Sequence, residues 1–157
     1  MYIKTTNSTN TLLKQLAAEG NPTEFIYAGY QTAGRGQTGN SWESEADKNL
    51  ICSILLPPDK DLYFLNIAVS VAIIRLIDEQ LTIKWPNDIY FGDKKLAGML
   101  IQNTIEGRMM GVSIIGIGLN VNQIEFSKDI PNPISLKMIT GEEYDLENLL
   151  NQLIINI

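Results

Sequence analysis

A glycine-rich loop that carries one cation is the first candidate for chemistry in this chain. Gly34-Arg35-Gly36-Gln37-Thr38-Gly39 places a guanidinium among three glycines, although the whole sequence has only three arginines. Glycine lets backbone N–H groups approach a ligand closely, at roughly 0.5–1 kcal/mol relative to alanine in regular structure. Such a loop is typical of an anion-binding site, with backbone donors and the guanidinium directed inward. A plain hairpin tip has a similar composition, so other segments must decide between an anion-binding loop and a hairpin without a ligand.

The second constellation is Lys84-Trp85-Pro86-Asn87-Asp88, which is followed six residues later by a lysine pair. Pro86 fixes the chain between two strands, so Asn87 and Asp88 are presented together at a strand end. An amide and a carboxylate suit Mg²⁺ or an incoming amine. Lys95 begins the next strand across a short turn, and Ala97-Gly98 removes side-chain bulk beside it, as expected where a ligand lies against backbone. A charged hairpin with solvated lysines is the alternative.

Composition excludes several classes of chemistry. The chain has 157 residues, enough for one domain with a substantial core, with 45% hydrophobic and 19% charged residues. A net charge of −6 argues against a nucleic-acid-binding protein that relies on a basic face. The absence of histidine removes His-based triads and His-ligated metals. The remaining Lys, Arg, Asp, Asn and backbone groups suit phosphoryl or nucleotidyl transfer, where positioning and charge neutralisation dominate.

We expect a cytoplasmic protein that does not cross a membrane. The first residues are followed at once by polar residues, and no apolar run typical of a signal peptide follows the N-terminus. The longest apolar stretch, residues 62–77, is interrupted by polar side chains and is too short to span a bilayer. The single Cys52 has no partner and lies in an apolar run, which favours a buried core thiol in a reducing compartment.

The sequence predicts an α+β domain with a mixed or antiparallel sheet and helices packed on one side. A polar cap before residue 11 and Gly20 after the apolar pattern predict a first helix over 11–19. We expect further helices over 61–80 and from about residue 145. Strands are expected over 24–31, 49–56, 82–85, 88–91, 95–103 and 109–120.

Taken together, the segments resemble those of biotin protein ligases, in order and rough spacing, from about Ser8 to Val121. The resemblance implies a fold related to class II aminoacyl-tRNA synthetases. It also implies an enzyme that makes biotinyl-5′-AMP from biotin and ATP with Mg²⁺, and then passes biotin to a lysine of a biotin carboxyl carrier protein. The motifs that carry it are Ser8-Thr9-Asn10, Gln31-Thr32-Ala33-Gly34-Arg35-Gly36, Trp42, Lys84-Trp85-Pro86-Asn87-Asp88, Lys95-Leu96-Ala97-Gly98 and Gly116-Ile117-Gly118-Leu119-Asn120.

By this resemblance the biotin ureido head would be bound by Ser8, Thr9 and Gln31, with Gly34 and Gly98 beside the ligand. Ser8 and Thr9 have a competing role, because they also begin the first helix.

The resemblance also implies three catalytic residues. Arg35 and Lys95 would neutralise the biotin carboxylate and the α-phosphate that it attacks, and removing such a donor commonly lowers the rate by about 10²–10³. Asp88 would orient or deprotonate the acceptor lysine. The nucleotide would be bound by Arg35, Gly36, Trp42, Asn87 and Asn120, and Mg²⁺ by Asn87 and Asp88.

The reaction implies that the loop over residues 32–44 orders over the adenylate, because water would destroy this mixed anhydride. Many bacterial ligases carry more arginines in this loop, where this chain has Gln37 and Asn40. With fewer cations near the phosphates, we expect this enzyme to release the activated intermediate more readily than arginine-rich relatives do.

We expect residues 1–157 to form a catalytic domain of the monofunctional type, without the family's small C-terminal β domain or a DNA-binding domain. A homodimer is compatible with the family. Two alternatives stay open: a catalytically weak biotin- or adenylate-binding module, and a lipoate or octanoate ligase of the same fold.

Overall fold

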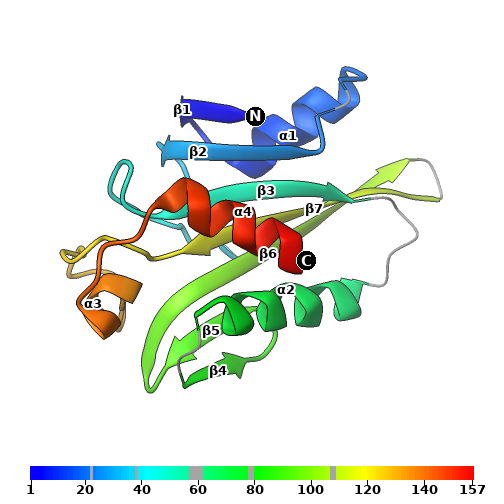
Figure 1. Ribbon diagram of the computed structural model, residues 1–157. Helices are drawn as coiled ribbons and strands as arrows, with labels where there is room; N and C mark the ends of the chain where they lie inside the picture. The colour runs from blue at the N-terminus through cyan, green and yellow to red at the C-terminus, as the bar shows by residue number, and fades with distance from the viewer. Residues whose placement is uncertain (22, 38, 57–61, 78–79, 107–108) are drawn as a thin grey trace.

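The strands form one mixed sheet in the computed structural model, which describes residues 1–21, 23–37, 39–56, 62–77, 80–106 and 109–157. Within these residues the strand order is β1-β2-β3-β7-β6-β5-β4 (Figure 1). β1 is parallel to β2, and the other neighbouring strands are antiparallel. Along the chain they are β1 (Tyr2–Thr6), β2 (Phe25–Gln31), β3 (Leu50–Leu56), β4 (Leu81–Lys84), β5 (Asp88–Phe91), β6 (Lys94–Glu106) and β7 (Met109–Leu119).

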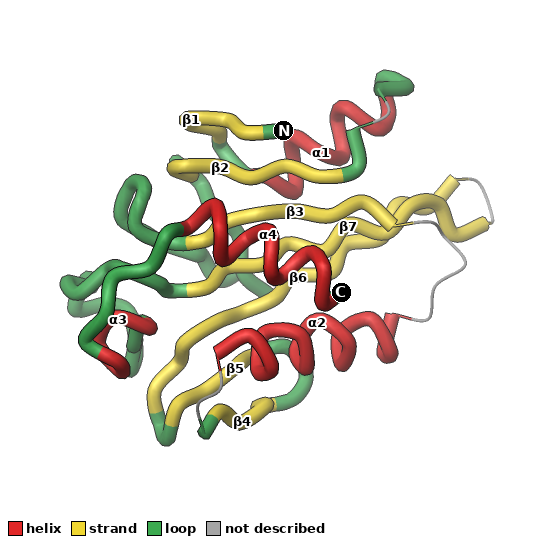
Figure 2. The backbone as a smooth tube through the Cα atoms, in the orientation of Figure 1, coloured by secondary structure: helices red, strands yellow, loops and turns green. Residues whose placement is uncertain are grey.

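Four helices accompany the sheet in the described part of the chain: α1 (Thr9–Ala18), α2 (Leu62–Ile77), α3 (Leu136–Thr140) and α4 (Leu146–Asn156). α2 and α4 pack against each other and lie next to one another in Figure 2. None of the helices in the described ranges is long and apolar enough to cross a membrane.

One face of the sheet, here called the covered face, carries the main hydrophobic core. Alternate residues of a strand point to opposite faces, and the register aligns Cys52 and Met99 with Ile117. These three side chains are at most 2% exposed and pack with Val69 and Ile73 of α2. The leucine stripe predicted near the C-terminus completes this core, with Leu149, Leu150 and Leu153 of α4 buried.

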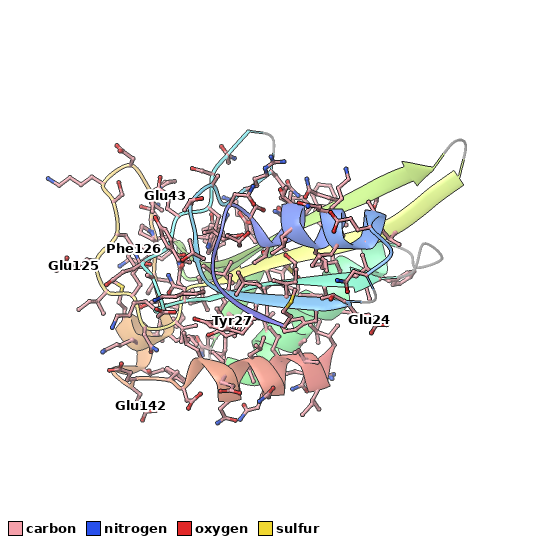
Figure 3. The ribbon with its side chains drawn as sticks, turned by 90° about the horizontal axis from the view of Figure 1, so that it is seen from above. Glu24, Tyr27, Glu43, Glu125, Phe126 and Glu142 are labelled. Atoms are coloured by element: carbon pink, nitrogen blue, oxygen red, sulfur yellow. The ribbon has the colours of Figure 1, made fainter. Side chains whose placement is uncertain are left out.

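The opposite face, here called the open face, carries α1 over only one part of the sheet. Leu13 of α1 packs on Ile26 of β2 and Ile114 of β7 in a second, smaller cluster. Figure 3 shows α1 and α4 on opposite sides of the sheet. The predicted mixed α+β class is therefore confirmed, whereas the expectation that all helices share one side is wrong for α1. The apolar stripe of α1 required a sheet face, and the sequence did not specify which.

The helix boundaries follow from capping residues. Ser8 is the N-cap of α1 and accepts a hydrogen bond from the Thr11 N–H, and Asp145 caps α4 through the Asn148 N–H. α3 is capped by Ser135 and ends at Gly141, whose φ of 78° glycine adopts readily.

Two elements were not predicted from the sequence. β1 is a five-residue edge strand whose side chains are largely exposed, and α3 is a single capped turn, so neither has an extended hydrophobic pattern. The other predicted elements are present within a few residues of the expected ends. Residues 61, 78 and 79 of the predicted second helix lie outside the described residues.

The chain after β7 is attached to the sheet by amide side chains. The Asn120 amide donates to the Ile134 carbonyl over 3.0 Å, and the Val121 N–H donates to the Asn49 side chain over 2.9 Å. Asn122 and Tyr144 exchange two hydrogen bonds of 2.8 and 2.9 Å. These contacts hold residues 130–136 next to the start of β6, at one border of the site described below.

Candidate active site

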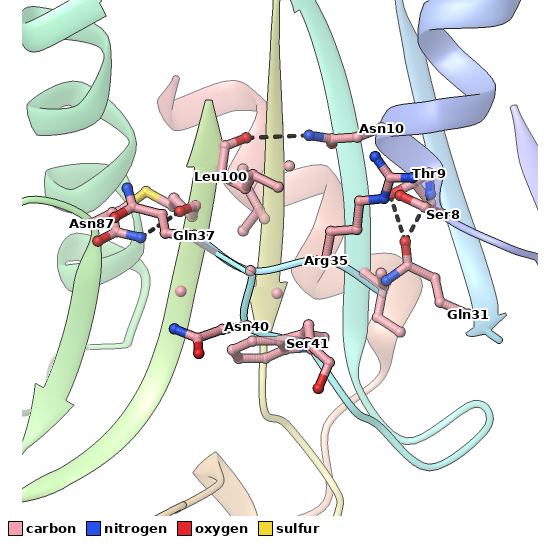
Figure 4. A pocket seen from close by; sticks show the side chains of 18 of the residues that line it. Ser8, Thr9, Asn10, Gln31, Arg35, Gln37, Asn40, Ser41, Asn87 and Leu100 are labelled. Carbon is pink, nitrogen blue, oxygen red and sulfur yellow. Dashed lines mark hydrogen bonds between the residues drawn. The ribbon is translucent and has the colours of Figure 1, made fainter. Parts of the chain in front are cut away.

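A cavity of about 160 Å³ opens on the open face where α1, the glycine-rich loop, β5, β6 and β7 meet (Figure 4). Most of the residues singled out in the sequence converge here, although they come from segments far apart in the chain. Those lining the cavity are Ser8, Thr9, Gln31, Arg35, Gly36, Trp42, Asn87, Asp88, Lys95 and Gly98. Gly34 borders a neighbouring depression, and Asn120 lines a third cavity beside Trp42.

The floor of the cavity is backbone. Gly98, Gly116 and Gly118 share the open face, because Gly118 is paired with Gly98 and Gly116 lies two residues before Gly118. A Cβ atom on Gly116 would lie 2.4 Å from Oδ1 of Asn10, and one on Gly118 would lie 2.4 Å from a Trp42 ring carbon. A side chain at either position would therefore collide with Asn10 or Trp42, which lie directly against the backbone of β7.

One end of the cavity is formed by polar side chains of α1 and β2. β2 ends at Gln31, whose Oε1 accepts a hydrogen bond from the backbone N–H of Thr9 over 2.7 Å and lies 3.1 Å from the Thr9 hydroxyl oxygen. Thr9 also contacts Ser53 of β3, and Ser53 contacts Asn10. The first turn of α1 thus supplies both the N-cap residue Ser8, which is buried, and the polar side chains of this end.

The glycine-rich loop is a hairpin. Arg35 and Ser41 form an antiparallel bridge, the Gly36 N–H donates to the Asn40 carbonyl over 2.7 Å, and the Trp42 N–H donates to the Gly34 carbonyl over 3.0 Å. Arg35 is exposed and, in the view of Figure 4, its side chain extends from the hairpin toward the Thr9 end of the cavity. The ordering of this loop on ligand binding stays a prediction.

Gly34 is required by close approach. A Cβ atom there would lie 2.3 Å from the Trp42 carbonyl oxygen and 2.9 Å from Nε2 of Gln31. Glycine at this position therefore lets the hairpin close and lets the Gln31 amide lie against its backbone.

The Trp42 ring separates the first cavity from the third. It lies against the backbone of Gly118, and the Nζ atom of Lys95 is 5.7 Å from its centroid. Its indole N–H is buried and has no hydrogen-bond partner among the described residues. The third cavity, of about 320 Å³, is lined by Trp42, Lys95, Asn120 and the segment from Phe126 to Pro133.

Lys95 and Asp88 form an ion pair of 2.9 Å at the charged end of the site. Their side chains are 31% and 21% exposed, so both remain within reach of a ligand. The β5–β6 hairpin, with its turn at Gly92, brings Lys95 back to the corner occupied by Asp88, as the sequence predicted.

The two asparagines have structural contacts. The Asn87 amide donates to the Met99 carbonyl over 2.7 Å, which leaves its Oδ1 for other contacts, and Asn120 donates to Ile134. No group of three or more His, Cys, Asp or Glu side chains suited to a metal occurs in the described part of the chain. Asn87 and Asp88 therefore offer at most a partial ligand set.

The remaining nucleophile of interest is excluded by its surroundings. Cys52 is 1% exposed and points to the covered face. Burial raises the pKa of its thiol to about 12, so the reactive thiolate is absent at neutral pH.

Several cavity residues were not predicted as site residues: Asn10, Gln37, Asn40 and Ser41 line it, and Ser53 lies beneath it. Ser53 had a detectable signal, because it is a polar residue at an inward position of an otherwise apolar strand. Asn10 was hidden by its position in the first turn of a helix, where asparagine commonly has a local capping role.

The fold is that of biotin protein ligase catalytic domains. The structure of biotin protein ligase from Aquifex aeolicus in complex with biotin and ATP matches 99% of this chain and 67% of its own, with 32% identity and a TM-score of 0.82. Sequence relatives point the same way. The bifunctional ligase/repressor BirA of Bacillus subtilis is 32% identical over 99% of this chain and 51% of its own length. The biotin–[acetyl-CoA-carboxylase] ligase of Paracoccus denitrificans is 29% identical over 94% of this chain and 67% of its own.

The chain belongs to the Biotin/lipoate A/B protein ligase family, whose profile matches residues 2–120. It spans about half the length of the BirA proteins of Bacillus that it matches.

Proposed function

We propose that this chain activates biotin with ATP to biotinyl-5′-AMP and transfers biotin to a lysine of a biotin carboxyl carrier protein. The observation that carries the proposal is one cavity with two chemically different ends. Thr9 and Gln31 form a hydrogen-bonding end that suits a urea ring, Lys95 supplies a cation at the other end, and the Arg35 side chain reaches over the cavity from the hairpin. The relatives named as biotin ligases, and the related structure with biotin and ATP, support the same reaction.

In the first step, the cations counter the repulsion between two anions. The biotin carboxylate must approach the α-phosphate of ATP, and both groups are negatively charged. Lys95 on rigid β6 and Arg35 on the hairpin would hold them together and stabilise the charge that develops at phosphorus. Gly34 and Gly36 leave the hairpin backbone accessible, and Gly98 leaves room for the ligand beside Lys95.

The nucleotide would extend past Trp42 into the third cavity. Trp42 offers an aromatic surface for adenine, and Asn120 lies in the same cavity wall. The residues present fit a Mg²⁺ ion that is bound chiefly by phosphates, since Asn87 Oδ1 and the Asp88 carboxylate supply two oxygen ligands. Such an ion would neutralise phosphate charge.

In the second step, Asp88 would accept a hydrogen bond or a proton from the acceptor lysine, which must be neutral to attack. Asp88 is held by Lys95 at 2.9 Å. Lys95 would turn toward the anionic ligand in the adenylate complex, which frees the carboxylate. The same pair would thus serve both steps.

We infer that residues 1–157 act as one catalytic domain, and that the protein partner is the carrier domain. The polar end of the cavity favours biotin over lipoate or octanoate, because a dithiolane or an alkyl chain offers no N–H or carbonyl to Thr9 and Gln31. A binding module without catalysis would have no need for Arg35, Lys95 and Asp88 around one ligand.

The decisive experiment incubates the chain with biotin, ATP and Mg²⁺ and detects biotinyl-AMP by mass spectrometry, with and without a carrier domain. Lipoate and octanoate replace biotin in parallel reactions, and a carrier whose acceptor lysine is changed to arginine is the control. Adenylate formation and lysine-dependent labelling support the ligase. Biotin binding without adenylate would assign the binding module instead, and preferential lipoate activation would assign the other branch of the family.

A further inference from the structure

Ser53 lies beneath the polar end of the cavity, where it contacts two cavity residues without lining the cavity itself. It lies on the open face of β3, is 0% exposed, and is paired with Gly116 of the neighbouring strand β7. Its Oγ atom is 2.7 Å from Oγ1 of Thr9 and 2.6 Å from Oδ1 of Asn10. The hydroxyl protons of Ser53 and Thr9 must therefore be distributed along a short buried row of hydrogen-bonded oxygens.

Backbone groups fix the direction of hydrogen bonding at both ends of this row of side chains. The Asn10 side-chain atom 3.3 Å from the Leu100 carbonyl oxygen must be a donor, because a carbonyl only accepts. The same nitrogen donates to Gln102 over 3.0 Å. The other Asn10 atom is thus an acceptor. At the far end, the Gln31 atom bonded to the Thr9 N–H must be oxygen, so the Gln31 nitrogen is free to donate.

The hydroxyl protons follow from these ends. Ser53 donates its only proton to Asn10 Oδ1, so it can only accept from Thr9. The 2.7 Å distance between Ser53 and Thr9 is typical of an O–H···O bond, whereas the 3.1 Å distance from Thr9 to Gln31 Oε1 is beyond the usual range of about 2.5–3.0 Å. The Thr9 proton therefore points to Ser53, and Thr9 presents only lone pairs to the cavity.

We propose that Ser53 is a positioning residue that makes Thr9 a hydrogen-bond acceptor toward the ligand, and that the site thereby selects a head group with an N–H at Thr9 and a carbonyl at Gln31. This inference rests on the proposed function, because the biotin ring is a cyclic urea with both groups. Asn10 completes the arrangement, since it holds the Ser53 proton away from Thr9. Ser53 itself touches no substrate.

Selectivity between two ligands tests this role more sharply than affinity alone. The probes are biotin and the two cyclic carbamates in which one or the other ring N–H is replaced by oxygen, each titrated calorimetrically. Dissociation constants are measured for the unchanged chain, Ser53→Ala, Ser53→Cys and Ser113→Ala. Ser113 is a matched control, because it is also 0% exposed and hydrogen-bonded, but it points to the covered face and bonds to Asn103.

In the unchanged chain, one carbamate is expected to bind at least about tenfold more weakly than biotin, because its ring oxygen would face the Thr9 lone pairs. Ser53→Ala frees the Thr9 hydroxyl to donate, so biotin should bind about tenfold more weakly while that carbamate is nearly unaffected, and the selectivity should largely disappear. Ser53→Cys, a weaker donor and acceptor of similar size, should fall between, and Ser113→Ala should leave the selectivity unchanged.

If Ser53→Ala weakened the binding of biotin and of that carbamate equally, or changed neither, the positioning role would be overturned and the proposed function would remain intact. Failure of the unchanged chain to bind biotin would overturn both.

Discussion

The two faces of this sheet are built from the same strands and have opposite properties. On β7, Ile115, Ile117 and Leu119 point to the covered face and are at most 2% exposed under α2 and α4. Gly116 and Gly118 alternate with them and form the floor of the cavity on the open face. Since one strand serves both purposes, neighbouring residues should differ in what their substitution destroys: stability on one face, ligand binding on the other.

Arg35→Gln should break the open face alone. We expect adenylate formation to fall by about 10²–10³, because a preorganised cation is removed from the developing phosphate charge. The free energy of unfolding should change by no more than about 0.5 kcal/mol, because Arg35 is exposed. Single-turnover kinetics and urea denaturation measure the two effects, with Arg75→Gln on α2 as the control. A rate within a factor of about three of the unchanged chain would exclude the proposed role of Arg35.

Ile117→Ala should break the covered face alone. The side chain is 2% exposed within the core, and its truncation should lower the free energy of unfolding by about 2–5 kcal/mol. Biotin affinity per folded molecule should be retained below the unfolding transition. Ile117→Val, which removes a single methyl group, should cost about 0.5–1.5 kcal/mol. A large loss of affinity with little loss of stability would mean that the two faces are not separable on this strand.

Gly118→Ala, one residue further, should act on the ligand and not on the core. Its Cβ would lie 2.4 Å from a Trp42 ring carbon, so the indole must move. Steric displacement of this kind costs about 1–3 kcal/mol, which predicts about a tenfold or greater increase in the KM for ATP. Trp42 fluorescence reports the displacement if the exposed Trp85 is changed to Phe in both chains. An unchanged spectrum together with an unchanged KM would contradict the placement of Trp42.

The pH dependence of stability should show the burial of Cys52 on the covered face. The pKa of the thiol is about 12 in the folded chain and about 9.0 when unperturbed, so between these values only the unfolded chain loses the proton. Stability should then fall as pH rises, by up to about 1.4 kcal/mol per pH unit. Urea midpoints at about pH 8 and about pH 10.5 measure this fall, and Cys52→Ala should show a smaller one. Equal falls in both chains would rule out this contribution.

Much of the site was predictable because its residues are marked by local chemistry. Arg35 lies between glycines, and the short turn after Phe91 returns Lys95 to Asp88, so sequence spacing alone brought the charged pair together. The polar end was less accessible. Thr9 and Gln31 were predicted by resemblance, but the contact of Ser53 with Thr9 joins residues 44 positions apart and depends on how α1 packs on β3.

Other features could not be read from sequence because they depend on tertiary choices. The apolar stripe of α1 indicated burial but not the face that it covers, which Ile26 and Ile114 determine. Likewise, the alternation in β7 predicted two faces, but only the position of the Trp42 ring shows why Gly118 must lack a side chain.

The hairpin that carries both Arg35 and Trp42 has a consequence for cooperativity. Its two arms are joined by the Arg35–Ser41 bridge and by the bond from the Trp42 N–H to the Gly34 carbonyl, so the cation and the indole belong to one body. A molecule that engages one of them raises the effective concentration of the other, because the hairpin is fixed once for both contacts. Two ligands that each touch one arm would therefore bind with positive coupling. A product that contacts only one arm would be held less tightly by the hairpin and would dissociate more readily.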